Sequence, residues 1–198
     1  SQHKPIVLTG LKCTHSPSDA RARVNGLTWT AEPINWPKAA KRTGMRITVV
    51  ASMRNEGPFI VEWVAWYRML GFTDVVVVTN NCTDHSPALL DALQAAGWVH
   101  HIRHDIPPGR LITRTKLKAA KGHRAVFRAD WVMVCDVDEF LVIHRGAGRI
   151  GDLIDLSANP PPFLGMSINW RVFGTSGLTA FEDVPVHRQF LYANAVGS

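Results

Sequence analysis

The chain has few of the residues and patterns that mark secreted, metal-stapled or membrane-spanning proteins. Its 198 residues include only three cysteines, Cys13, Cys82 and Cys135, whose wide spacing fits neither a structural zinc site nor a disulfide framework. No apolar stretch approaches the roughly 20 residues that cross a bilayer, and the N-terminus lacks a charged start followed by an apolar signal core. These absences favour a soluble cytoplasmic protein with reduced thiols.

The glycine patterns of the common nucleotide-binding loops are missing as well. No Gly-x-Gly-x-x-Gly follows the first β-branched run of the chain, and there is no Gly-Lys-Ser/Thr phosphate loop. A dinucleotide-dependent dehydrogenase and a P-loop enzyme are therefore disfavoured.

Positive charge is in excess. The formal net charge is +6, which favours an anionic partner: nucleic acid, a phosphorylated small molecule or the inner face of an acidic membrane. Residues 109–128 carry eight basic side chains, histidine included, and no carboxylate. Most of these side chains are explained by a solvated helix face. No nucleic-acid partner is expected, because the segment lacks interleaved exposed aromatics and a recognisable reading element.

From Met45 onward, strand and helix patterns alternate, and the 46% hydrophobic content is enough to fill a core. Residues 1–44 are interpreted as an N-terminal extension with one short strand-like run, and residues 45–198 as the main domain. The alternation predicts an α/β fold with a mostly parallel sheet flanked by helices. The expected strands are 45–52, 74–80, 99–106, 130–138 and 163–174, and the expected helices are 55–72, 86–98 and 109–128.

The first expected helix is well punctuated. Asn55 is a candidate cap, Pro58 falls in the first turn, where its missing N–H costs nothing, and Gly71 closes the end. Its large apolar residues recur at three- and four-residue steps, which is typical of a core-facing stripe. They are Phe59, Trp63, Trp66, Tyr67 and Leu70.

Three acids follow the apolar run 131–135. Asp136 and Asp138 are two residues apart, so they point to the same side if the strand continues that far, whereas Glu139 points away and is not expected to be a ligand. Two convergent carboxylates suit Mg²⁺ or Mn²⁺, ions that are commonly shared between protein carboxylates and substrate phosphates. The ordinary alternative is a pair of solvated acids in a turn.

Two further loops, 52–57 and 79–86, are expected at the same edge of the sheet, where such folds bind ligands. Their Asn, Asp, Ser and Thr residues also suit plain turns. A zinc site built from His100, His101 and His104 is disfavoured, because neighbouring side chains of a strand diverge.

Four segments in order carry a family resemblance: "MRNEGPFIVEWVAWYRMLGF", "VVVVTNNCTDHS", "ADWVMVCDVDEFL" and "NWRVFGTSG". Over residues 45–177 the chain resembles the glycosyltransferase family 2-like group with the GT-A fold, in the branch with an Asp-x-Asp-Glu-Phe-Leu motif. The resemblance implies inverting, metal-dependent transfer of a sugar from a UDP- or GDP-linked donor to a carbohydrate or glycolipid acceptor. Relatives usually continue beyond the last segment, so a further C-terminal segment is expected to be lacking here.

The same resemblance suggests roles for individual residues. Asp138 would hold the metal directly, and Asp136 would contact the ribose or the metal's water shell. Glu56, Asn80 and Asp84 would line the nucleoside pocket. Many relatives carry an acid at the position of Thr79 or Asn80 that accepts a hydrogen bond from the base; here neither residue is charged, which leaves the choice of base open.

An inverting transferase also needs a carboxylate base, and the late candidates are Glu182 and Asp183, for which solvated loop acids are the alternative. Trp170 is expected in the core rather than at a sugar. A phosphatase is disfavoured, because its Asp-x-Asp motif follows the first strand and is not followed by a residue like Phe140. A degenerate transferase that binds a nucleotide or a partner without turnover remains the other alternative.

Overall fold

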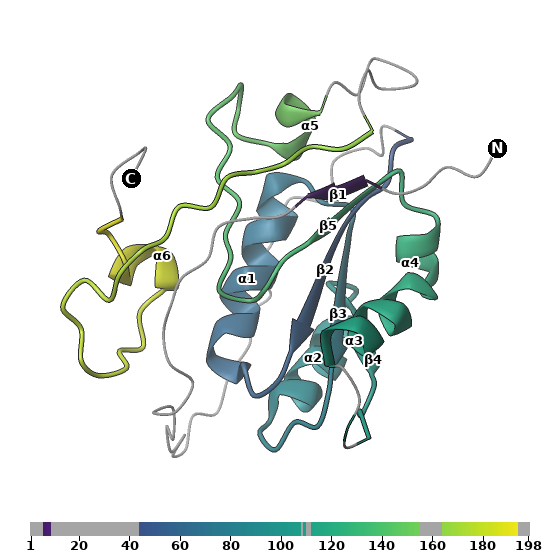
Figure 1. The fold of residues 1–198 in the computed structure, drawn as a ribbon, viewed down its shortest axis with the longest axis horizontal. Helices are drawn as coiled ribbons and strands as arrows, with labels where there is room; N and C mark the ends of the chain where they lie inside the picture. The colour runs from purple at the N-terminus through teal and green to yellow at the C-terminus, as the bar shows by residue number, and fades with distance from the viewer. Residues whose placement is uncertain (1–5, 9–43, 108, 110–111, 155–163, 194–198) are drawn as a thin grey trace.

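A parallel sheet forms the centre of the computed structural model, which describes residues 6–8, 44–107, 109, 112–154 and 164–193 (Figure 1). Five strands pair in the order β1-β5-β2-β3-β4, and every pairing is parallel. This arrangement confirms the predicted α/β fold with a parallel sheet flanked by helices. The strands are β1 (Ile6–Leu8), β2 (Ile47–Met53), β3 (Asp74–Thr79), β4 (His100–Arg103) and β5 (Trp131–Val134).

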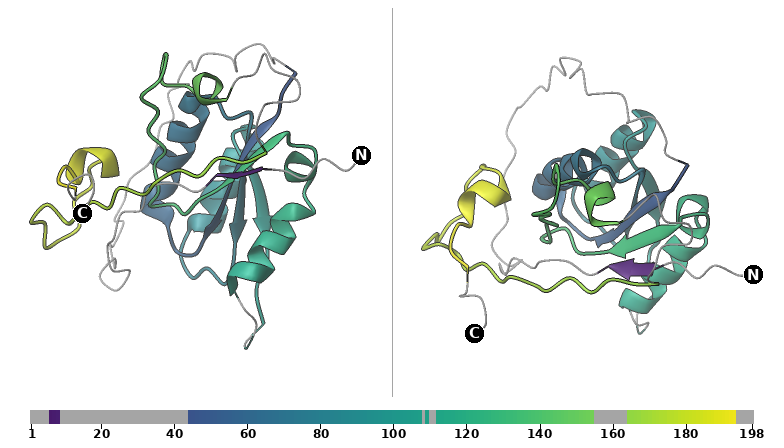
Figure 2. Two further views of the ribbon diagram at one scale, coloured as in Figure 1. Left: turned by 45° about the horizontal axis from the view of Figure 1, so that its top comes forward. Right: turned by 90° about the horizontal axis from the view of Figure 1, so that it is seen from above.

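Helices cover both faces of the sheet (Figure 2). On one face, α1 (Gly57–Leu70) and α2 (Ser86–Ala95) pack on the larger apolar core, which α5 (Ile150–Leu153) and α6 (Val186–Gln189) also join. On the other face, α3 (Ile112–Lys121) and α4 (Arg124–Phe127) cover a smaller core of valines and alanines. Strand residues alternate between the two cores, as expected for a sheet that is buried on both sides.

The start and end of α1 agree with the sequence-based prediction in most respects. Pro58 lies in the first turn, and Gly71 caps the end with φ 97°, a left-handed conformation that glycine adopts without steric cost. The N-terminal cap is Glu56 instead of Asn55, whose own φ is 59°. The predicted stripe is buried at Trp63, Tyr67 and Leu70 and partly buried at Phe59 and Trp66.

Three expected elements differ from the structure. The basic segment forms two helices, because His123 adopts an extended conformation and its Nδ1 accepts the Ala125 N–H at 3.2 Å, which starts α4 anew. Strand β5 ends at Val134 and does not reach Asp138. The strand expected at 163–174 is absent from its described part, where only Phe173 makes an isolated bridge, to Ala193.

The N-terminal region contributes β1, which extends the sheet beside β5. Residues 1–5 and 9–43 lie outside the described part of the chain, so the boundary between an extension and a domain at residue 44 stays a prediction. Among the described helices, none combines the length and the apolar character that a membrane span requires.

Candidate functional site

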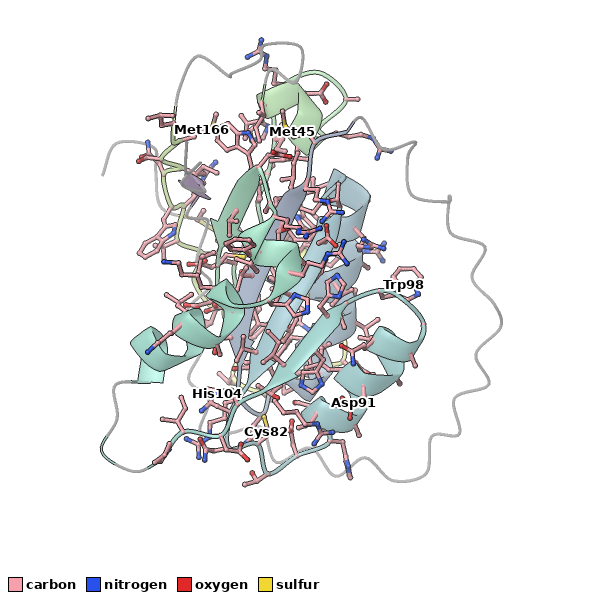
Figure 3. All side chains as sticks on the ribbon, turned by 90° about the vertical axis from the view of Figure 1, so that its right-hand side faces the viewer. Met45, Cys82, Asp91, Trp98, His104 and Met166 are labelled. Carbon is pink, nitrogen blue, oxygen red and sulfur yellow. The ribbon has the colours of Figure 1, made fainter. Side chains whose placement is uncertain are left out.

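The carboxyl ends of the parallel strands meet at one edge of the sheet, and the loops that follow them gather there. Figure 3 shows Cys82 and His104, from the loops after β3 and β4, at one end of the sheet, and Met45, which precedes β2, at the other. Open α/β sheets bind ligands at this carboxyl edge. The predicted residues Glu56, Asn80, Asp84, Asp136 and Asp138 all belong to loops on this edge.

The segment 135–141, named here the acid loop, presents two of these carboxylates. Because β5 ends at Val134, the acids are arranged by a turn and not by strand alternation; the Glu139 N–H donates to the carbonyl oxygen of Asp136 at 3.2 Å. Val137 between them is buried in the core, whereas Asp136 is exposed and Asp138 partly exposed. The turn therefore leaves Asp136 open to solvent and Asp138 accessible in part.

Glu139 has a structural role that was not predicted from the sequence. It is only 3% exposed, and its Oε2 accepts the Asp136 N–H at 2.9 Å, which closes the turn from the other direction. A carboxylate that accepts a backbone N–H three residues away is a common local anchor, so the Asp-x-x-Glu spacing was the available signal. Glu139 thus holds the backbone that carries Asp136.

Three aromatic donors of α1 bind the acid loop from the core side. Trp63 Nε1 donates to the carbonyl of Asp136 at 3.0 Å, and the Tyr67 hydroxyl donates to that of Glu139 at 3.0 Å. Trp66 Nε1 donates to the carbonyl of Leu141 at 2.9 Å. The aromatic stripe of α1 is therefore core, as predicted, and it also fixes the backbone of the acids.

The polar groups behind the acid loop stay protonated. Burial raises the pKa of the Tyr67 hydroxyl well above its usual range, so the hydroxyl remains able to donate. Burial also raises the pKa of the Cys135 thiol, whose Sγ lies 3.4 Å from the Tyr67 oxygen. A buried thiol in its neutral form is a packing group and not a nucleophile.

The loops after β2 and β3 are tied to each other. Asn55 donates from Nδ2 to Thr83 Oγ1 at 3.0 Å, and its Oδ1 accepts the Thr83 N–H at 2.8 Å. Asn55 and Asn81 both have positive φ, at 59° and 44°. Left-handed conformations of this kind are enriched at functional sites, where surrounding bonds hold them in place. The two loops thus form a fixed rim beside the acid loop.

Asp84 lies in the predicted loop, and its oxygens bind the starts of two helices. Oδ2 accepts from the Gly57 N–H at 3.3 Å and from the Ser86 hydroxyl at 2.6 Å, and Oδ1 accepts the Ser86 N–H at 3.0 Å. A nucleoside contact from Asp84 would compete with these bonds. Glu56, the cap residue of α1, is partly buried, and its side chain does not bond to the helix's own first N–H groups.

Asn80 is the one buried residue of this edge with an unsatisfied acceptor among the described residues. It is 2% exposed, and its Oδ1 has no hydrogen-bond partner, while its Nδ2 lies 3.4 Å from Asn81 Oδ1. A buried acceptor without a partner costs about 1–3 kcal/mol, so native structures rarely keep one without a reason. A ligand donor that reached this oxygen would remove that cost.

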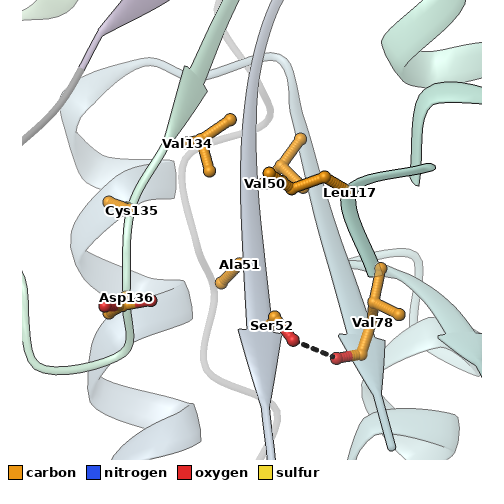
Figure 4. Close-up of a pocket in the computed structure, with 8 residues that line it drawn as sticks. All are labelled: Val50, Ala51, Ser52, Val78, Leu117, Val134, Cys135 and Asp136. Carbon is orange, nitrogen blue, oxygen red and sulfur yellow. Dashed lines mark hydrogen bonds between the residues drawn. The ribbon is translucent and has the colours of Figure 1, made fainter. Parts of the chain in front are cut away.

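A small pocket opens beside the acid loop (Figure 4). It has a volume of about 90 Å³ and lies between the carboxyl-terminal halves of β2, β3 and β5 and the α3 residue Leu117. Asp136, Ser52 and Val78 line it, and Asn80, which directly follows β3, is not among its lining residues. Pockets for whole small ligands measure about 300–1,000 Å³, so this one admits only part of a nucleotide.

The donor set at the acid loop suits a hard cation. No group of three or more His, Cys, Asp or Glu residues within the described ranges could enclose a metal ion. Asp136 and Asp138 instead supply two carboxylates, which is the typical protein share for Mg²⁺ or Mn²⁺ when phosphate oxygens complete the shell. His100 pairs with Asp74 and His101 pairs with Asp91. A zinc site built from His100, His101 and His104 therefore stays disfavoured.

Glu182 and Asp183 lie in a second group, segment 181–190, which is docked on the outer side of α1. Both acids are exposed, and neither makes a side-chain hydrogen bond or ion pair within the described chain. Figure 1 shows this part of the chain beside α1. Trp170 is 55% exposed, so the expectation that it belongs to the core is wrong; the segment that carries it makes no strand.

Comparisons with known proteins place the chain in a transferase family. No curated protein and no solved structure matches it. A family model for glycosyltransferase family 92 matches residues 46–190, which span the sheet, the acid loop and segment 181–190. The motifs therefore indicated the right class of protein but a different group, the family 2-like one. The chain belongs to glycosyltransferase family 92.

Proposed function

We propose that the protein transfers a sugar from a nucleotide diphosphate sugar to a hydroxyl acceptor, with inversion and with Mn²⁺ or Mg²⁺. The observation that carries this proposal is the acid loop: one exposed and one partly exposed aspartate at the carboxyl edge of a parallel sheet, on a backbone fixed by Trp63, Tyr67 and Glu139. Preorganised groups of this kind need no rearrangement during the reaction, which is why they stabilise developing charge effectively. Family membership supports the transfer of a sugar.

The acid pair has a defined task in such a reaction. Asp138 would hold the cation directly, and Asp136, at the mouth of the pocket, would hold the ribose or the cation's water shell. A bound cation offsets the negative charge that the leaving diphosphate accumulates. The chain's own contribution is to present both carboxylates from a turn whose backbone cannot move freely.

The nucleoside would lie over the loop after β3. The imide N–H of uracil or guanine is a donor of the kind that Asn80 Oδ1 lacks. Binding would then remove the cost of the unsatisfied buried acceptor, which makes the contact more favourable than an ordinary exposed hydrogen bond. Both bases carry such an N–H, so this contact alone is compatible with UDP- and GDP-linked donors.

Replacing Asn80 by leucine tests this contact. The side chains have the same number and branching of heavy atoms, and the exchange removes an unpartnered polar atom, so thermal stability is expected to stay close to that of the wild type. Nucleotide affinity, measured by titration calorimetry with UDP and GDP in Mn²⁺, is expected to fall about tenfold or more, in line with the loss of one buried hydrogen bond. Equal affinity in both proteins would show that Asn80 does not contact the base.

The acceptor hydroxyl needs a base, and Glu182 or Asp183 is proposed for that step. An exposed carboxylate has the right chemistry to accept the hydroxyl proton as the oxygen attacks the anomeric carbon and the diphosphate leaves. In support, the segment that carries them packs on α1 through Phe181 and Phe59, and Trp63 of the same helix binds the acid loop.

Release of sugar from the donor tests the proposal as a whole. Purified protein is incubated with UDP- and GDP-linked sugars in Mn²⁺, in Mg²⁺ and in excess chelator, and free nucleotide diphosphate is measured. Metal-dependent release that chelator abolishes is the expected result. Tight nucleotide binding without any release, with or without candidate acceptors, would instead identify a degenerate transferase that acts as a binding module.

A further inference from the structure

Segment 181–190 presents an aromatic ring beside two carboxylates. Phe181 is 46% exposed, and its ring packs edge-to-face on Phe59 of α1, with centroids 6.2 Å apart and an interplanar angle of 78°. Glu182 and Asp183 follow directly and are exposed. From the sequence, these two acids are candidate bases or solvated loop acids, and Phe181 has no predicted role.

The position of Phe181 relative to the acid loop follows from contacts along α1. Phe59 and Trp63 are four residues apart on the helix, so their side chains are neighbours on one face, with Cβ atoms about 5–6 Å apart. Trp63 donates to the carbonyl of Asp136 at 3.0 Å. The aromatic ring and the acid loop are thus bound to successive turns of the same helix, at the end where the strands β2 and β5 finish.

Several bonds hold the segment in place. Glu62 accepts the Val186 N–H at 2.9 Å and His187 Nδ1–H at 2.7 Å, so this carboxylate caps the start of α6 from outside. Val186 is buried in the main core. Gln189 Nε2 donates to the carbonyls of Glu182 at 2.6 Å and Val184 at 2.5 Å, which folds the loop back on α6. Phe181 is therefore presented from an anchored loop.

We propose that Phe181, Glu182 and Asp183 form the acceptor subsite and that the acceptor is a carbohydrate whose pyranose ring stacks on Phe181. The inference rests on the proposed sugar transfer and adds to it the residues that would hold the acceptor. A pyranose ring has an apolar C–H face that packs on an aromatic ring and hydroxyl groups at its rim that donate to carboxylates. A lipid chain would find its apolar surface interrupted by two charges, which disfavours it.

The experiment uses saturation-transfer NMR on the whole chain with methyl glycosides of glucose, galactose, mannose and N-acetylglucosamine, each with and without UDP or GDP and diamagnetic Mg²⁺. Four proteins are compared: wild type, Phe181→Ala, Phe181→Trp and Phe127→Ala. Phe127 is 78% exposed on α4, on the other face of the sheet, and serves as a matched control for loss of an exposed phenylalanine.

At least one glycoside is expected to receive saturation from the wild type. The signal should fall at least fivefold in Phe181→Ala, return in Phe181→Trp and stay unchanged in Phe127→Ala. Absence of glycoside binding in the wild type under every condition, or binding that survives Phe181→Ala, overturns the subsite.

The nucleotide signals in the same samples separate the two claims. Nucleotide binding in Mg²⁺ together with glycoside binding that is unaffected by the Phe181 variants overturns the subsite and leaves the sugar transfer standing. Phe181-dependent glycoside binding without any nucleotide binding supports the subsite and overturns the transfer.

Discussion

The variant Asp138→Asn is expected to lose metal-dependent sugar release by about 10²–10³-fold, the range seen when one preorganised electrostatic group is removed from an active site. Asparagine has nearly the same shape and keeps one oxygen, so the turn that carries position 138 should survive. What it removes is the negative charge that would hold a cation against the donor's phosphates. The rates are measured with UDP- and GDP-linked sugars over a series of Mn²⁺ concentrations.

A matched control lies at the opposite end of the same strand. Asp130 directly precedes β5, is exposed, and accepts the Arg46 N–H at 2.7 Å. The variant Asp130→Asn changes the net charge equally but acts at the amino edge of the sheet, so its rate and metal dependence should match the wild type. Asp138→Asn with an unchanged metal requirement would mean that the acid loop does not hold the cation.

The sequence was informative where structure depends on neighbouring residues. Pro58 and Gly71 marked both ends of α1 because their backbone preferences act locally, and the β-branched runs of β2 and β3 are buried on both faces as their composition indicated. The order of strands and helices then predicted the parallel sheet, and with it the edge on which the loops gather.

The conformation of the acid loop was not predictable from local sequence patterns. The residues that shape it, Trp63 and Tyr67, lie more than 70 positions away in the chain, and no local pattern announces a bond from an indole or a phenol to a backbone carbonyl. The sequence therefore placed both acids at this edge of the sheet, but by an argument from strand alternation that the early end of β5 overturns.

The structure of the C-terminal part of the domain was predicted less accurately, because it too depends on residues that are distant in the chain. Residues 163–174 have a strand-like composition, but a strand also needs a partner, and within the described chain only Phe173 finds one. Trp170 and Val172 are consequently exposed instead of buried. Docking of segment 181–190 depends on Glu62, more than 120 positions earlier, and could not be foreseen from its own residues.

Replacing Trp63 is expected to have the largest effect on stability and to separate packing from positioning. Its side chain is fully buried, so Trp63→Ala should lower the free energy of unfolding by about 3–5 kcal/mol, as measured by urea denaturation. Trp63→Phe keeps most of the apolar volume but removes the donor to the carbonyl of Asp136, and should cost about 1–3 kcal/mol. The second variant is expected to remain folded at room temperature.

The test of positioning is whether Trp63→Phe weakens donor binding more than its stability loss explains. Thr48→Val is the matched control, because Thr48 is fully buried and its hydroxyl donates to the carbonyl of Ala125 at 2.7 Å on the α4 side of the sheet. Both variants lose one side-chain hydrogen bond to a backbone carbonyl, and both should be destabilised. Only Trp63→Phe should reduce the affinity for nucleotide in Mn²⁺, by about tenfold, since only it releases the backbone of Asp136. Equal nucleotide affinities in the two variants would mean that the aromatic face of α1 contributes packing and does not position the acid loop.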